Sequence, residues 1–259
     1  MTYQCILTSI DETTYVASIT LNRPEALNAL NFQLMTELNH ALATFDQNPA
    51  VRAILISGSE KAFAAGADIK EMVEATPMEM LSKGYLEMWD AVAAIHKPTI
   101  AAVSGYALGG GFELALACDI LVASETAKFG FPEVNIGVIP GAGGTQRLSR
   151  IVGTKKAMEL ILTGKQITAA DAYGMGLINH VYPQSSYLDD AKKLTAEIAS
   201  KAPLAVRMAK EAVHNSDRTF IHSGIELERR LFSILFSTSD MREGMKAFIE
   251  KRKPVWNGH

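Results

Sequence analysis

The sequence has few of the features that mark secreted or membrane proteins. Its two cysteines, Cys5 and Cys118, form no recognisable disulfide framework, so we expect a reducing compartment, the cytoplasm. The N-terminus lacks a basic start followed by a long apolar run, and no secretory signal is therefore expected. No apolar run reaches the ~18 residues of a membrane-spanning helix, which predicts a chain that does not enter a membrane.

Clustered positive charge and metal-binding patterns are also missing. The chain holds 25 Lys and Arg against 28 Asp and Glu, a net charge of −3, and the two signs are interspersed. Without a basic block, nothing in the composition favours a nucleic-acid partner. The six histidines show no spacing typical of metal ligands, so we expect no metal site.

Several catalytic and cofactor motifs are absent as well. The G-x-S-x-G turn of one class of serine hydrolases does not occur, and neither glycine cluster is followed by the Lys-Ser or Lys-Thr of a phosphate loop. Gly109 and Gly111 do not complete a dinucleotide fingerprint. With these mechanisms excluded, the remaining candidate is acid–base chemistry, in which carboxylates act beside backbone N–H donors.

One stretch combines the parts for that chemistry. An apolar strand over residues 99–103 leads to three glycines and a helix over 112–118, whose one polar side chain is Glu113. A helix that is apolar on every side is buried, so this carboxylate lies at the edge of a core. The first N–H groups of the helix lack partners, and glycines let a ligand approach them. Such donors beside an acid can bind an oxyanion and move a proton, although a glycine-rich turn with an acid that suits the helix dipole fits equally well.

Two further stretches carry charged residues in unusual surroundings. Small residues over 62–67 leave the backbone open, and Asp68 and Lys70 follow; a local cap and a solvated charge are the plainer interpretation. Pro132 stiffens the backbone beside Glu133 in a mostly apolar loop, which makes this acid a candidate for a raised pKa and for acid catalysis. For the loop alone, an acid facing water is the favoured interpretation.

The alternation of elements predicts an α/β or mixed architecture. A helix capped by Asn31 and stopped by Pro49 separates the early strands, and helical patterns dominate from Pro203 onward. Thr168 and Asp171 are spaced as in a capping box, which predicts a helix start there. We therefore place a mixed core at residues 1–197 and a helical region at 198–259, rich enough in apolar surface to pack on a partner subunit. The predicted strands cover residues 4–10, 14–21, 51–57, 99–103 and 120–123.

Together, the stretches 62–70, 105–113 and 129–148 resemble the crotonase superfamily, specifically a short-chain enoyl-CoA hydratase. The similarity runs over essentially the whole chain. It implies an α/β fold with a crotonase (ClpP-like) β-β-α spiral core and a helical C-terminal trimerisation region, commonly in a hexamer made of two trimers. It also implies an acyl-CoA thioester substrate and no separate cofactor, because coenzyme A is part of the substrate.

The resemblance assigns roles to individual residues. It puts the oxyanion-hole amides on Ala67 and Gly110 and the catalytic glutamates on Glu113 and Glu133. Gly141 falls where a backbone N–H helps to hold the catalytic water. The positions that match contacts to substrate and coenzyme A, in part from a neighbouring subunit, are Ala67, Asp68, Ile69, Lys70, Gly110, Phe232, Phe248 and Lys251.

Two residues depart from the pattern of relatives. Glu25 stands where related hydratases often carry a basic residue near the CoA phosphates. Phe131 is more apolar than the residue of some relatives, which points to an effect on acyl preference.

The resemblance implies hydration of a short-chain trans-2-enoyl-CoA at its 2,3 double bond to give 3-hydroxyacyl-CoA, in fatty-acid beta-oxidation or related acyl-CoA catabolism. Glu113 would take a proton from water and Glu133 would protonate C2, although such pairs titrate as a unit. Double-bond isomerisation is the nearest alternative, but it commonly needs one acid. A non-catalytic RNA-binding or scaffold homologue is the other, and the missing basic stripe argues against it.

Overall fold

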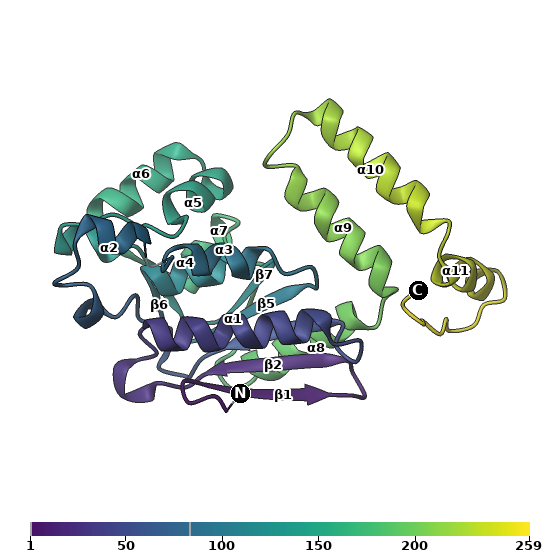
Figure 1. Ribbon diagram of the computed structural model, residues 1–259, viewed down its shortest axis with the longest axis horizontal. Helices are drawn as coiled ribbons and strands as arrows, with labels where there is room; N and C mark the ends of the chain where they lie inside the picture. Colours follow the sequence, from purple (N-terminus) through teal and green to yellow (C-terminus); the bar gives the residue numbers. More distant parts are fainter. Residues whose placement is uncertain (1, 83) are drawn as a thin grey trace.

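The computed structural model describes residues 2–82 and 84–259, and within them the strands form two sheets (Figure 1). The larger, six-stranded sheet has the order β1-β2-β3-β5-β7-β10. Strands β1 and β2 form an antiparallel pair, and the remaining neighbours are parallel. Its strands are β1 (Ile6–Asp11), β2 (Val16–Leu21), β3 (Ala53–Ser57), β5 (Thr99–Val103), β7 (Ile120–Ser124) and β10 (His180–Tyr182).

The central strands β3 and β5 are buried at every position, because helices cover both faces of the sheet. Alternate residues of each strand face opposite sides. Ile54 and Ala101 join the core beneath α1 (Phe32–Gln47), whereas Leu55 and Ile100 pack against α8 (Tyr187–Ala199).

The smaller, four-stranded sheet positions the loops that matter for function. Its order is β4-β6-β8-β9, with β4, β6 and β8 parallel and β9 antiparallel. Each of its first three strands follows a strand of the larger sheet and precedes helical structure, so the expected β-β-α repeat is confirmed. Its strands are β4 (Ala62–Ala64), β6 (Tyr106–Leu108), β8 (Lys128–Gly130) and β9 (Gln166–Thr168).

Local signals set several helix boundaries. The Asn31 side chain accepts a hydrogen bond from Leu34 N at the start of α1, as its capping pattern predicted. Thr168 and Asp171 form the expected capping box of α7. The helices of the core are η1 (Pro24–Ala26), α1 (Phe32–Gln47), η2 (Ile69–Glu71), α2 (Pro77–Ser82), α3 (Glu87–Ala93), α4 (Gly110–Ala117), η3 (Pro132–Ile136), α5 (Gly144–Val152), α6 (Thr154–Thr163), α7 (Ala169–Gly174) and α8 (Tyr187–Ala199).

The predicted helix over 112–118 begins two residues earlier than expected, at Gly110. Packing explains the difference, because two glycines fit here where larger residues do not. A Cβ on Gly111 would lie 2.1 Å from the Ala64 carbonyl oxygen, and one on Gly110 would lie 3.1 Å from the Trp89 ring. The close approach of neighbouring segments outweighs the poor helix propensity of glycine.

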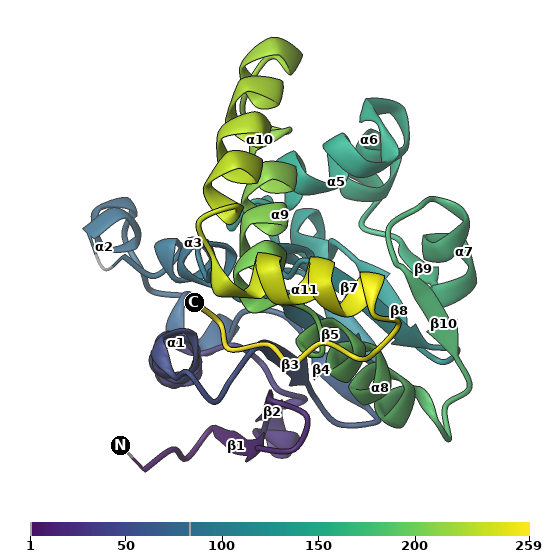
Figure 2. The same cartoon turned by 90° about the vertical axis from the view of Figure 1, so that its right-hand side faces the viewer.

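Three helices follow the core: α9 (Pro203–Asn215), α10 (Ile221–Leu235) and α11 (Ser239–Ile249). Figures 1 and 2 show α9 and α10 projecting from the body as a pair. Half-buried Asp119 anchors α9, because its carboxylate lies 2.7 Å from both Lys210 Nζ and His214 Nε2. Residue 197 lies inside α8, which packs on the sheet, so the division at 197/198 stays a prediction.

Within the described residues, no helix is long and apolar enough to cross a membrane.

Candidate active site

Glu113 lies in the first turn of α4 and is 3% exposed. Its Oε1 accepts hydrogen bonds from Ala142 N at 2.8 Å and Gly144 N at 2.7 Å, at the start of α5. Burial raises the pKa of Glu113, while the two amide bonds and the charge of Arg147 lower it. Oε2 accepts no hydrogen bond from residues 2–82 or 84–259, so one oxygen is fixed and the other is free of protein partners.

Arg147 supports this arrangement from α5. Its Nη1 donates a 2.8 Å hydrogen bond to the carbonyl of Ala142, the residue whose N–H binds Glu113. The sequence showed Arg147 as one of two formal charges in residues 129–148, the other being Glu133, but gave it no role.

Glu133 lies in η3, directly after Pro132, and its side chain is half-buried. Burial, together with the nearby charge of Glu113, raises its pKa to about 7. Its Oε2 is buried and has no hydrogen-bond partner among the residues that the structure describes. The raised pKa expected of this loop acid is therefore confirmed, and the alternative of an acid facing water is wrong.

The glycines next to the two acids allow the close packing of this site. A Cβ on Gly109 would lie 2.8 Å from Oε1 of Glu133, so only a glycine lets the carboxyl rest against this backbone. Gly109 also has φ of +49°, which favours glycine. On the opposite side, a Cβ on Gly144 would lie 2.7 Å from the Phe131 ring and 2.9 Å from Oε1 of Glu113.

Phe131 lies in the core beside Glu113. It is 1% exposed, and its ring stacks on Phe112 with centroids 4.9 Å apart. The ring therefore helps to keep water from the carboxylate of Glu113.

Ala67 and Gly110, the residues predicted to supply oxyanion-hole amides, lie side by side. Ala67 forms an isolated parallel bridge with Leu30, in which Leu30 N donates to Gly66 O and Asp68 N donates to Leu30 O. In a parallel bridge the central residue directs its own N–H away from its partner, so the Ala67 amide is free of that ladder.

Gly110 is the first residue of α4, and its N–H has no partner within the helix. A Cβ on Gly110 would lie 3.4 Å from the Ala67 nitrogen. In the part of the chain that the structure describes, neither amide nitrogen donates a hydrogen bond to the protein. Two unpaired donors therefore stand together at the start of the helix that carries Glu113.

The segment after Ala67 is held by Asp68. Its carboxylate accepts from Lys70 N at 3.3 Å and lies 3.1 Å from Arg23 Nη1, so the predicted local cap is confirmed and an ion pair is added. The side chains of Ile69 and Lys70 are exposed. Sequence reasoning missed Arg23, because 45 residues separate it from its partner.

Gly141 immediately precedes the residue that binds Glu113 through its amide. It is exposed, and a Cβ there would lie 3.5 Å from Leu86 Cδ2. Gly141 therefore lies at an open side of the site.

The C-terminal candidates lie elsewhere in the single chain. Phe232 on α10 is 62% exposed, Phe248 on α11 is 86% exposed, and Lys251 follows α11. Figure 1 shows α10 and α11 well separated from α3 and α4, so one chain does not bring these residues to Ala67 and Gly110.

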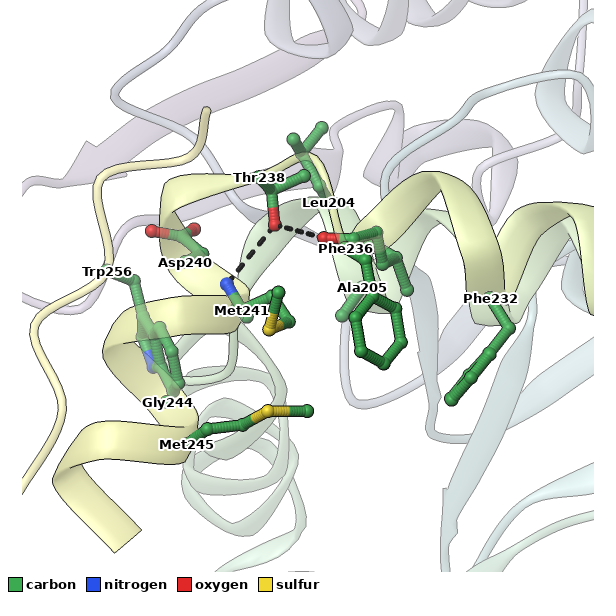
Figure 3. Close-up of a pocket in the computed structure, with 12 residues that line it drawn as sticks. Leu204, Ala205, Phe232, Phe236, Thr238, Asp240, Met241, Gly244, Met245 and Trp256 are labelled. Atoms are coloured by element: carbon green, nitrogen blue, oxygen red, sulfur yellow. Dashed lines mark hydrogen bonds between the residues drawn. The ribbon is translucent and has the colours of Figure 1, made fainter. Parts of the chain in front are cut away.

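An apolar cavity of about 270 Å³ lies among α9, α10, α11 and the C-terminal tail, and its lining includes Phe232, Phe236, Met241 and Met245 (Figure 3). It contains neither catalytic candidate, Glu113 or Glu133. Across residues 2–82 and 84–259, no group of three His, Cys, Asp or Glu side chains is placed to hold a metal.

Residues 11–259 match the family model described as enoyl-CoA hydratase/isomerase. The chain belongs to this family. Among its members, the chain is 51% identical over 254 residues to a probable enoyl-CoA hydratase, echA8, of Mycobacterium tuberculosis, covering 98% of both chains. It is 50% identical over 238 residues to the mitochondrial enoyl-CoA hydratase of Pongo abelii, covering 92% of this chain and 82% of that protein.

Solved structures of the family agree with the fold. The structure of an enoyl-CoA hydratase subunit I from Geobacillus kaustophilus superposes with a TM-score of 0.96 at 44% identity, covering 99% of both chains. The expected α/β crotonase fold is therefore confirmed. The chain is an enoyl-CoA hydratase, a hydro-lyase acting on acyl-CoA thioesters, as the resemblance implied.

Proposed function

We propose that the chain hydrates a short-chain trans-2-enoyl-CoA to 3-hydroxyacyl-CoA, in fatty-acid beta-oxidation or related acyl-CoA catabolism. In this proposal Glu113 and Glu133 are the catalytic acids and bases, and the amides of Ala67 and Gly110 form the oxyanion hole. One observation carries this proposal: the two amides and the two carboxyls all lie around the start of α4. The Glu113 carboxylate accepts amide hydrogen bonds, whereas the Glu133 carboxyl has a buried oxygen to which no described residue donates.

The thioester oxygen binds between the two amides. Attack of water on C3 places enolate-like charge on that oxygen, and losing one such donor typically costs roughly 10²–10³-fold in rate. Both donors belong to backbone fixed by a bridge or a helix start, so little reorganisation is needed as the charge develops.

The two carboxyls divide the proton transfers. Glu113 takes a proton as the water oxygen bonds to C3, and Glu133 gives its proton to C2 as the enolate collapses. The amide bonds at Oε1 of Glu113 stabilise the acceptor form, whereas the pKa of about 7 leaves Glu133 protonated in a large fraction of molecules at neutral pH. Positioned groups of this kind contribute about 10²–10⁴-fold each.

The remaining site residues hold the reactants. The Gly141 amide lies beside the turn that binds Glu113 and contributes to holding the water. Asp68, Ile69 and Lys70 follow the Ala67 amide directly, so a thioester bound there places its CoA portion along them. Phe232, Phe248 and Lys251 complete the CoA site from a neighbouring subunit.

That arrangement requires a homo-oligomer, and we propose a trimer or a hexamer made of two trimers. Large apolar side chains are exposed along the C-terminal helices, including Phe220 at 89%, Ile221 at 80% and Phe248 at 86%. Burying them against another copy removes this surface from water. Sedimentation equilibrium tests the assembly, and a monomer at micromolar concentration would contradict it. The cytoplasmic location stays a prediction.

The decisive experiment is hydration of crotonyl-CoA by the purified chain. We expect the absorbance of the conjugated enoyl thioester to fall as 3-hydroxybutyryl-CoA forms. Rates across enoyl-CoA esters of increasing length then test the preference for short chains. Incubation with a 3-enoyl-CoA separates hydration from isomerisation, and a chain that only isomerises would refute the proposal.

A further inference from the structure

Two buried aromatic residues near the start of α3 donate hydrogen bonds to the backbone around the amide pair. The Tyr85 hydroxyl donates to the carbonyl of Leu30 at 2.6 Å, and Trp89 Nε1–H donates to the carbonyl of Gly110 at 2.9 Å. The side chains are 7% and 1% exposed. Their rings meet edge to face, with centroids 5.4 Å apart at 86°.

The acceptor of the Tyr85 bond orients Ala67. The Leu30 carbonyl also accepts the N–H of Asp68, and this bond forms one side of the bridge that turns the Ala67 amide outward. The phenol therefore binds the same oxygen that fixes the first oxyanion donor. Bonds to a buried carbonyl restrict it more than packing alone, because they are directional.

Trp89 holds the second donor. Its indole binds the Gly110 carbonyl, and its ring lies 3.1 Å from the position that a Cβ on Gly110 would occupy. The indole therefore contacts Gly110 in two ways: it donates a hydrogen bond to the Gly110 carbonyl, and its ring carbon Cζ2 packs beside the Gly110 Cα.

The two amides come from different parts of the chain. Ala67 follows β4 and Gly110 follows β6, and no hydrogen bond between the described residues joins the two directly. The buried Tyr85 hydroxyl and the buried Trp89 N–H each need a hydrogen-bond acceptor in the core. Here both acceptors lie in the two segments whose spacing defines the oxyanion hole.

We propose that Tyr85 and Trp89 are positioning residues that set the spacing of the two oxyanion donors, Tyr85 through the Leu30 bridge to Ala67 and Trp89 through Gly110. The inference rests on the proposed roles of those two amides. An oxyanion hole stabilises developing charge only if its donors are fixed within a few tenths of an ångström, so loosening either tie weakens the transition state more than substrate binding.

The test uses Tyr85→Phe, which removes one oxygen and keeps the ring against Trp89. Tyr187→Phe is the matched control, because Tyr187 is also buried but is the first residue of α8 and packs in the separate core cluster between α8 and the larger sheet. Trp89→Phe removes the second tie. For each variant, kcat and KM for crotonyl-CoA are measured. The absorption maximum of a bound aminocinnamoyl-CoA thioester is recorded as well, since polarisation of its carbonyl shifts the band to longer wavelength.

We expect Tyr85→Phe and Trp89→Phe each to lower kcat about tenfold with KM changed less than about twofold, and to reduce the spectral shift. Tyr187→Phe should match the unaltered protein in both measurements. A Tyr85→Phe protein that melts earlier but keeps kcat and the full shift would show a structural role and overturn the inference.

Two further outcomes of this experiment also have a definite interpretation. If Tyr85→Phe does not fold, Trp89→Phe decides by the same spectrum, and an unchanged shift there rejects the proposal. If the unaltered protein itself produces no shift on binding the chromophore, the oxyanion role of Ala67 and Gly110 fails, which is distinct from failure of the aromatic pair.

Discussion

Raising the pH through neutrality removes the proton that Glu133 has to donate. Its pKa of about 7 arises from burial and from the charge of Glu113, so the protonated fraction is about one half at pH 7 and about one tenth one unit higher. We therefore expect kcat/KM to fall about fivefold over the first pH unit above 7 and about tenfold for each further unit.

The acid limb depends on the other carboxyl. Glu113 has to be ionised to accept a proton, and burial raises its pKa above the ordinary value for glutamate. The profile is therefore a bell with its upper limb set by Glu133. The assay is the initial rate of crotonyl-CoA absorbance loss from about pH 5 to about pH 9 at low substrate.

The same proton affects the stability of the fold. An ordinary ion-paired acid makes the protein more stable as the pH rises, whereas Glu133 makes it less stable. Because the folded-state pKa of Glu133 is raised from 4.5 to about 7, its contribution to stability is full below 4.5 and is lost as the pH rises through 7. With 1.36 kcal/mol per pKa unit, discounted because the side chain is only half-buried, this loss is about 1 kcal/mol.

Glu133→Gln separates the two effects. The amide carries no charge at any pH, so the variant should lose most of its activity and also lose the decline in unfolding free energy between about pH 5 and about pH 8, measured by urea denaturation. A flat kcat/KM above neutrality in the unaltered protein, or a Glu133→Gln protein at full rate, would refute the reasoning.

Three other substitutions test separate parts of the structure. Glu113→Gln should abolish most turnover while CoA esters still bind, as measured by inhibition and calorimetry, and full activity would remove Glu113 from the mechanism. Gly144→Ala should lower kcat and the melting temperature, because its Cβ would lie under 3 Å from Phe131 and from the Glu113 carboxylate; an unchanged protein would show that the turn relaxes freely. Asn31→Ala should cost about 1 kcal/mol in urea denaturation with no change in kcat, since only the cap of α1 is lost.

Features set by neighbouring residues were predictable from the sequence. The Asn31 cap and the Thr168–Asp171 capping box need only a few adjacent residues, and both occur as predicted. Glu113 could be singled out for the same reason, since an acid inside an apolar helix needs no tertiary information to be unusual.

Features set by distant contacts were not predictable. The start of α4 at Gly110 depends on Trp89 and Ala64, and glycine propensity alone argues for a later start. The bond from Tyr85 to Leu30 spans 55 residues. No local pattern marks such a tyrosine, because its function depends on which carbonyl the folded chain places before it.

The different surroundings of the two glutamates bear on the order of proton transfers, which the sequence left open. One catalytic cycle moves a proton from water to Glu113 and another from Glu133 to C2, so the pair keeps the same total number of protons but ends with them exchanged. The next cycle then requires a proton to return to Glu133. Charge on Glu113 raises the pKa of Glu133, and no donor in the described part of the chain bonds to the buried Oε2 of Glu133 to stabilise its anion. When Glu113 loses its proton, the amides of Ala142 and Gly144 stabilise its negative charge, and that charge favours return of a proton to Glu133, so the pair recovers its starting state.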